Sequence, residues 1–185
     1  YGSKVGLEID QIAWFLALFV AGGAASQYPA GWLADRFDRR HVLIGLSVAS
    51  IFAASLTVAL SQVGPNAVLT ASFIFGLTTF PIYSVAAAHA HDFATQDERV
   101  ELSAALMFLY ALGAIASPLV VSWLIEAFGP RAMFYLVSVA HLVLVVFGIL
   151  RMRKRAATKK TRYVWSLRTS FQSGKLTGWK RDRSD

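Results

Sequence analysis

The chain has 185 residues, of which 56% are hydrophobic and only 16% are charged, and its mean hydropathy is +0.51. This composition excludes an ordinary soluble domain, and the absence of cysteine excludes a disulfide framework or a thiolate metal site. The net charge of +7 does not indicate nucleic-acid binding, because twelve of the 18 Lys and Arg residues lie from Arg151 onward.

Five apolar segments are predicted to cross a lipid bilayer as helices. A helix needs about 20 apolar residues to cross about 30 Å of hydrocarbon. The predicted spans are about 11–34, 42–62, 67–88, 102–125 and 132–150. The sequence therefore predicts an all-α, multi-pass integral membrane protein with the bilayer as its partner.

Small residues and helix breakers mark several of these spans. Gly22, Ser26 and Ala30 form a stripe on the first span, which allows another helix to approach closely. Gly64-Pro65 is a tight-turn signal after the second span. Helix bends are predicted at Pro29, Pro81, Gly113 and Pro118.

Residues 156–185 form a basic tail without hydrophobic periodicity, predicted to be disordered or to lie on anionic lipid headgroups. A cytoplasmic C-terminus places sixteen Lys and Arg residues inside and leaves Lys4 and Arg131 outside, in agreement with the positive-inside rule. Because the chain starts at Tyr1 rather than Met, a fragment without its natural N-terminus is expected.

The connection between the first two spans reads Gly31-Trp32-Leu33-Ala34-Asp35-Arg36-Phe37-Asp38-Arg39-Arg40. It resembles the motif of the major facilitator superfamily: glycine, any residue, leucine, small, aspartate, basic, any residue, glycine, basic, basic. Nine of the ten positions fit, and the departure is Asp38, where the family has glycine. Asp tolerates turn geometry, although the tightest form of the turn favours glycine.

The resemblance implies a twelve-helix transporter that moves a small solute by alternating access, and not an enzyme. Residues 1–155 would be part of its C-terminal half, helices eight to twelve, with the N-terminal half and one further helix missing. The bacterial inner membrane is the implied location. The motif residues are expected to hold the two halves together on the cytoplasmic side, with close helix contact at Gly31. The predicted gating residues are Gly31, Asp35, Arg36, Arg39 and Arg40.

The family further implies that the first, third and fourth spans line a central cavity. The candidates for substrate contact there are Gln27, Tyr83 and Tyr110, with an interhelical hydrogen bond as the alternative for each. No span has Asp, Glu, Lys or Arg near its centre, so proton coupling and uniport both stay open. His141, at the middle of the fifth span, is a candidate coupling residue or a structural one.

Two other kinds of function stay open. His89, His91 and Asp92 could serve a metal-dependent membrane enzyme at the cytoplasmic face. However, positions i and i+2 face opposite sides of a helix, so no metal site, cofactor or catalytic residue is predicted. A non-transporting scaffold or sensor would signal through the basic tail.

Overall fold

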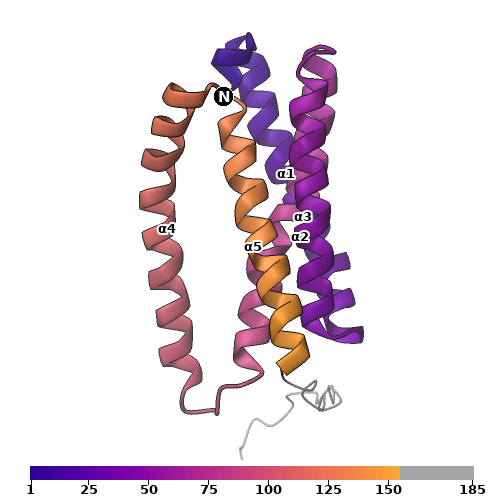
Figure 1. Ribbon diagram of the computed structural model, residues 1–185. Helices are drawn as coiled ribbons and strands as arrows, with labels where there is room; N and C mark the ends of the chain where they lie inside the picture. Colours follow the sequence, from indigo (N-terminus) through magenta and orange to yellow (C-terminus); the bar gives the residue numbers. More distant parts are fainter. Residues whose placement is uncertain (155–185) are drawn as a thin grey trace, which may run out of the picture.

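The computed structural model describes residues 1–154, which form one short 3₁₀ helix and five long α-helices (Figure 1). The helices are η1 (Gly2–Val5), α1 (Ile9–Arg36), α2 (Arg39–Leu60), α3 (Pro65–His91), α4 (Arg99–Phe128) and α5 (Ala132–Lys154). Successive long helices run in opposite directions. The α1–α2 and α3–α4 connections and the end of α5 therefore lie together, at what we call the hairpin end of the bundle.

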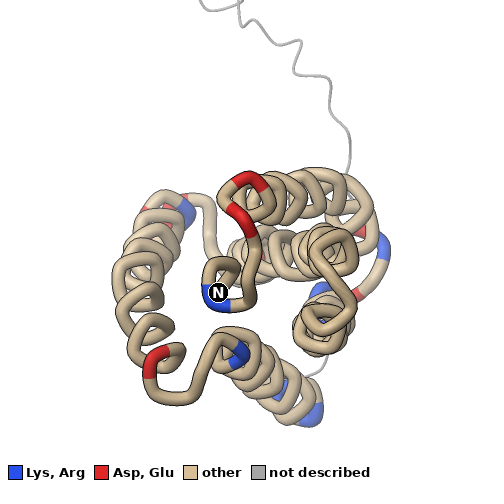
Figure 2. Tube along the Cα trace, turned by 90° about the horizontal axis from the view of Figure 1, so that it is seen from above, with Lys and Arg blue, Asp and Glu red and all other residues tan. Residues whose placement is uncertain are grey.

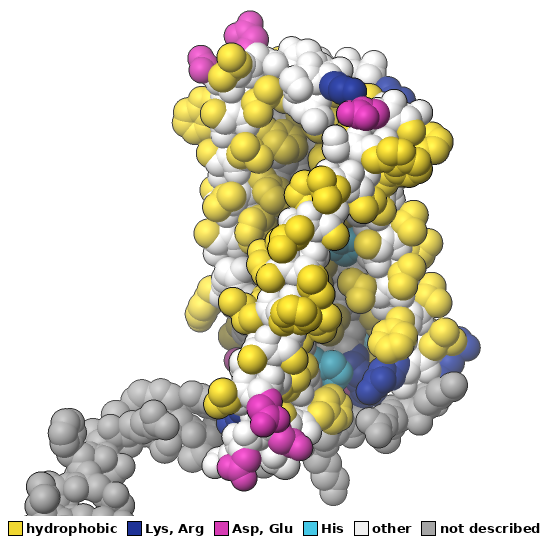
Figure 3. All heavy atoms as spheres, turned by 90° about the vertical axis from the view of Figure 1, so that its left-hand side faces the viewer, with side chains coloured by type: hydrophobic (Ala, Val, Ile, Leu, Met, Phe, Trp, Pro, Cys, Tyr) yellow, Lys and Arg dark blue, Asp and Glu magenta, His cyan; other side chains and the backbone are white. Residues whose placement is uncertain are grey.

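All five long helices are long and apolar enough to cross a membrane. Apolar side chains cover the middle of the visible surface, and charged side chains gather at its two ends (Figure 3). Polar groups at the ends and apolar groups between them match the layers of a bilayer. The predicted all-α membrane class is confirmed, and no strand occurs among residues 1–154.

The observed helices extend beyond most of the predicted spans because their polar ends also continue the helical hydrogen bonding. The second helix is the exception, since it ends at Leu60 rather than near residue 62. Gly64 has φ 144° and Pro65 occupies the first turn of α3, where a missing N–H costs nothing. The predictions for the basic tail fall on residues outside the described part of the chain.

Helices α1 and α3 pack backbone against backbone. A Cβ atom on Gly22 would overlap the carbonyl oxygen of Phe73, and one on Gly76 would overlap the carbonyl oxygen of Phe19. Ser26 and Ala30 continue the contact and are buried, and Ser26 Oγ donates to its own helix at Gly23 O, 2.8 Å away. The predicted small-residue stripe is therefore confirmed as a helix-packing face.

The core lies toward the end of the bundle opposite the hairpin. Phe75 of α3 and Phe134 of α5 pack edge to face with ring centroids 5.6 Å apart, against Ala53 and Ala54 of α2. The Tyr1 ring meets Phe134 at 4.7 Å and fixes the N-terminal segment to this core. Such aromatic contacts add to the dispersion attraction that replaces the hydrophobic effect within a membrane.

Helix α4 stands apart from the other four. It has no buried residue, and among the described residues it packs only against α3 and α5 (Figure 2). Met107, Phe108 and Tyr110 are all more than half exposed. Since a membrane helix must be covered by lipid or by protein, most of the surface of α4 is available to a further partner.

Candidate functional site: the Arg39 cluster and its groove

The α1–α2 hairpin is a two-residue connection, Phe37 and Asp38. The Phe37 N–H donates to Leu33 O at 2.8 Å and closes α1. Asp38 has φ −60° and ψ 122° and caps α2, because its Oδ1 accepts the Arg40 N–H at 3.0 Å. This φ suits any residue, so the turn needs no glycine. The departure from the family motif is accommodated by an N-cap aspartate.

Asp38 also pairs with the Arg40 side chain. Arg40 Nη2 lies 2.8 Å from Asp38 Oδ2, and Nε lies 3.2 Å from both carboxylate oxygens. These charge-assisted hydrogen bonds lower the pKa of Asp38 from 3.8 to about 2. Arg40 therefore helps to hold the hairpin closed.

Replacement of Asp38 with alanine is expected to lower the stability of the folded protein by about 1 kcal/mol. Asp38→Gly should cost less, because glycine is a tolerated N-cap. Since the folded-state pKa is depressed, the contribution of Asp38 is complete above pH 3.8 and is lost as the pH falls toward about 2. The difference in thermal midpoint between wild type and Asp38→Ala should thus be present at pH 6 and should shrink at pH 2. An equal difference at both pH values would contradict this assignment.

Arg39 joins the ends of three helices. Its Nη1 donates to Asp92 Oδ1 at 2.5 Å and to Ala88 O at 2.8 Å, both at the end of α3. Its Nη2 lies 3.5 Å from Asp35 Oδ1 on α1. We call Asp35, Arg39, Asp92 and the Ala88 carbonyl the Arg39 cluster.

The contacts within the Arg39 cluster differ in strength. The contact with Asp35 is long, and the Asp35 side chain is 77% exposed, so it adds little to stability within this chain. The Arg39 side chain is only 21% exposed and its short bonds run to α3. The link between α2 and α3 is therefore the strong one, and Asp35 presents a carboxylate at the surface.

Three predicted gating residues lie outside the cluster: Arg40, which pairs with Asp38, and Arg36 and Gly31. The Arg36 guanidinium stacks over the Trp32 ring, 4.5 Å from its centroid. Gly31 is exposed, and a Cβ atom there would meet nothing within 4 Å among the described residues. Among residues 1–154 no helix packs closely at Gly31, because α1 turns its Gly22, Ser26 and Ala30 face toward α3, and a close contact of Gly31 with an opposing half stays a prediction.

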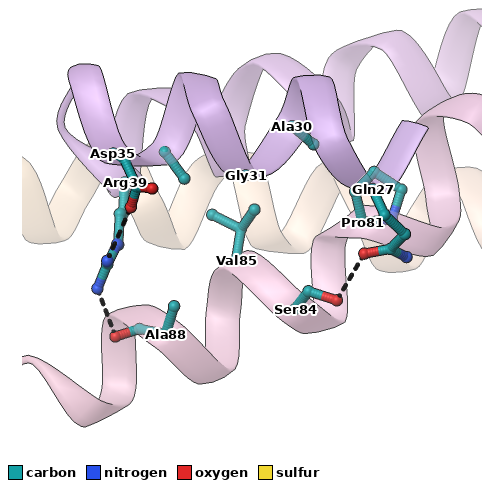
Figure 4. A pocket seen from close by; sticks show the side chains of 10 residues that line it. Gln27, Ala30, Gly31, Asp35, Arg39, Pro81, Ser84, Val85 and Ala88 are labelled. Carbon is teal, nitrogen blue, oxygen red and sulfur yellow. Dashed lines mark hydrogen bonds and ion pairs between the residues drawn. The ribbon is translucent and has the colours of Figure 1, made fainter. Parts of the chain in front are cut away.

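A groove of about 100 Å³ runs between α1 and α3 beside the Arg39 cluster. Its walls are formed by small and apolar residues between a polar end at Gln27 and an ionic end at Arg39 (Figure 4). The lining residues are Gln27, Ala30, Gly31, Ala34, Asp35, Arg39, Pro81, Ser84, Val85 and Ala88. Ser84 Oγ donates to Gln27 Oε1 at 3.0 Å, so the predicted alternative of an interhelical hydrogen bond is realised for Gln27.

Tyr83 and Tyr110 meet on the other side of α3. Their ring centroids are 5.2 Å apart with planes tilted by 55°, and the Tyr83 hydroxyl lies 3.7 Å from Met107 Sδ. Tyr83 and Ser84 are neighbours in α3, so the three cavity candidates are connected through this one helix. The rings join α3 to α4.

His141 is buried on the face of α5 that packs against α2, together with Phe134. Its Nδ1 lies 2.7 Å from Val137 O, and since a carbonyl only accepts, Nδ1 carries the proton. This bond to its own helix supports a structural role, whereas coupling by His141 stays a prediction.

The three prolines predicted to bend helices lie inside α1, α3 and α4. Each removes one backbone N–H and frees the carbonyl four residues earlier, at Ala25, Leu77 and Ala114. Gly113 has open space around it. The helices continue through all four positions, and a bend at each stays a prediction.

The histidines of the metal hypothesis point to different neighbours. His91 Nε2 lies 3.3 Å from Ser103 Oγ of α4, whereas His89 packs edge to face on Phe93 and lies 3.9 Å from Asp92. No group of three metal-ligating side chains occurs among residues 1–154. Asp92 instead pairs with Arg39, a role that the sequence analysis missed. The sequence held one sign of this pairing, because Asp92 is an acidic residue at the end of the third span, on the same side of the membrane as the α1–α2 hairpin.

Five apolar helices with an ion-pair cluster between helix ends define a multi-pass integral membrane protein. The family model of the Major Facilitator Superfamily (MFS) matches residues 1–182, and the chain belongs to this family. No solved structure matches the chain significantly.

Several curated relatives are MFS-type transporters described as uncharacterized. The chain is 30% identical over 143 residues to one from Yersinia enterocolitica, which covers 77% of this chain and 36% of the relative. It is 32% identical over 138 residues to one from Yersinia pestis, and 29% identical over 138 residues to YcaD of Escherichia fergusonii. Each of these two alignments covers 75% of this chain and 35% of the relative, so the chain spans about a third of the length of these relatives.

Proposed function

We propose that this chain is part of the C-terminal half of a secondary transporter, which moves a small solute across the bacterial inner membrane by alternating access. The Arg39 cluster carries the proposal. It fixes the hairpin ends of α2 and α3 to each other beside an open groove, while the Asp35 carboxylate of α1 lies exposed next to Arg39. A rigid surface of this kind can make contacts with an opposing half in one state of the transporter and lose them in the other.

Three features support an opposing half that covers the hairpin end. The Nε–H of Arg39 is buried and has no hydrogen-bond partner among the described residues. The helices α1 and α3 leave a groove of small side chains, and α4 has no buried residue. A second half of the same transporter would cover these surfaces, with the C-terminus and its basic tail on the cytoplasmic side, near anionic headgroups. Proton coupling, at His141 or in the missing part, belongs to the same proposal.

Asp35→Asn in the full-length protein is expected to impair transport and to leave membrane insertion intact. Insertion should survive because the contact between Asp35 and Arg39 is long and exposed. Gating should suffer because the substitution removes the charge that faces the opposing half. The measurement is the initial rate of flux into vesicles of a solute that the wild-type protein moves. Flux at the wild-type rate would refute the gating role of Asp35.

A cysteine probe tests the same proposal without knowledge of the substrate. This chain has no cysteine, so Ser84→Cys places one thiol at the groove once upstream cysteines are replaced. Asp35→Asn should increase the labelling of that thiol by a membrane-impermeant maleimide from the hairpin end. Asp97→Asn, an exposed acid in the α3–α4 connection, is the control and should not change the labelling.

A further inference from the structure

Tyr83, Tyr110 and Met107, which we call the aromatic cluster, lie well inside the membrane layer. Tyr110 is eleven residues from the start of α4 and Tyr83 is eight residues from the end of α3. At 1.5 Å per residue, these positions lie about 16 and about 12 Å from the hairpin end. Gln27, nine residues from the end of α1, lies at about the same depth. The three predicted cavity residues therefore form one level across α1, α3 and α4.

The aromatic cluster is open on its outer side. Tyr83 is 40% exposed, Tyr110 59% and Met107 61%, although the tyrosine rings touch each other. Tyrosines in membrane proteins gather at the headgroup level, where the hydroxyl finds polar partners. At the depth of Tyr110, hydrocarbon would leave the hydroxyl without a partner. The cluster thus suits a cavity that admits water or solute better than a lipid-facing surface.

This level of the bundle offers few hydrogen bonds and no charge. Between Asp10 and Asp35 on α1, between Pro65 and His89 on α3, and between Glu101 and Glu126 on α4, no ionisable acid, base or histidine occurs. The polar groups that α1, α3 and α4 place at this level include the Gln27 amide and the hydroxyls of Tyr28, Ser84, Tyr83 and Tyr110. A charged solute would lose its hydration here without a countercharge from these helices.

From this chemistry, and on the basis of the proposed transport function, we propose that the aromatic cluster binds an uncharged aromatic solute. The exposed faces of Tyr83 and Tyr110 offer stacking to a planar ring, and the Met107 sulfur is a favourable neighbour of a ring edge. The hydroxyl of Tyr83 or Tyr110 can exchange one hydrogen bond with a single polar substituent. Polyhydroxylated and ionic solutes are disfavoured because these helices offer few hydrogen bonds and no countercharge at this level.

The test uses four probes of one size and the full-length protein in lipid nanodiscs. The probes are 2-naphthalenemethanol, its fully saturated analogue, 2-naphthoate and 2-naphthylmethylammonium. Equilibrium dialysis, with empty nanodiscs subtracted, gives the affinity for each. We expect the aromatic alcohol to bind about tenfold more tightly than the other three. Equal or tighter binding of the saturated or charged probes would overturn the inference.

Variants assign the binding to the cluster. Tyr110→Leu should weaken binding of the aromatic alcohol about tenfold. Tyr110→Phe should keep the affinity for this alcohol within about threefold of wild type, because the ring face remains. Tyr135→Leu is the matched control, since Tyr135 of α5 is also 59% exposed but lies away from the cluster. This variant should bind the aromatic alcohol with wild-type affinity. Tyr83→Leu replaces Tyr110→Leu if the latter does not elute as a folded protein. Unchanged affinity in the folded leucine variants would overturn the inference.

The Ser84→Cys labelling assay on the same preparations separates this inference from the proposed function. If Asp35→Asn still changes labelling but the aromatic alcohol does not bind selectively, only the substrate class is wrong. If Asp35→Asn changes neither labelling nor flux, the transport proposal itself fails, and the substrate inference fails with it.

Discussion

Replacement of Gly76 with alanine is expected to separate α1 from α3 and to prevent the protein from folding stably. The added methyl group would overlap the Phe19 carbonyl oxygen, which belongs to a helix backbone and cannot rotate away. Overpacking typically costs about 1–3 kcal/mol, and the cost here should reach the upper part of that range or exceed it. The measurement is the yield of monodisperse protein in mild detergent together with its thermal midpoint. Gly22→Ala should behave in the same way, because it meets the Phe73 carbonyl oxygen.

Gly45→Ala is the matched control for these variants. Gly45 also lies inside a long helix, α2, but a Cβ atom there meets nothing within 4 Å. The substitution should therefore be neutral or stabilise the protein by about 0.5–1 kcal/mol, the ordinary gain from removing a helix glycine. Equal thermal midpoints for Gly76→Ala and Gly45→Ala would show that α1 and α3 do not pack backbone to backbone.

The helical fold could be predicted from the sequence because membrane helices follow from apolar length alone. The stripe of Gly22, Ser26 and Ala30 also predicted a packing face. The helix that packs against this stripe could not be predicted. Small residues also occur in the third span, at Ala71, Ser72 and Gly76, but the sequence alone does not show that they face the first helix. Helix periodicity describes one helix at a time. The pairing of α1 with α3, rather than with its chain neighbour α2, depends on tertiary packing.

The candidate site shows the same limit. The motif identified Asp35 and Arg39, but the strongest partner of Arg39 is Asp92, 53 positions along the chain. Asp92 follows two histidines, and these residue types suggested a metal, although their helical spacing argued against one. Gly31 was expected at a helix contact because glycine permits one, yet α1 directs a different face toward α3. Residue type indicated which side chains could form ion pairs, whereas the direction in which each side chain faces required the structure.

Replacement of Arg39 with glutamine is expected to have the largest effect of any substitution in the cluster. It removes the bonds to Asp92 and the Ala88 carbonyl and leaves both groups without their cationic partner. Hydrogen bonds to charged groups contribute about 1.5–3 kcal/mol, which corresponds to a loss of about tenfold or more in a transport step that depends on them. Arg39→Lys should be intermediate, because an ammonium cannot reproduce the planar fork of donors. Initial flux rates and thermal midpoints measure the two effects.

A double-mutant cycle decides whether Arg39 acts through Asp92. If it does, adding Asp92→Asn to Arg39→Gln should cost much less than Asp92→Asn alone, since the shared contact is already lost. Arg99→Gln, at the exposed start of α4 on the same end of the bundle, controls for a general loss of positive charge and should transport normally. Additive losses would mean that Arg39 and Asp92 contribute separately. The 2.5 Å contact between them would then have no part in holding α2 to α3 during transport.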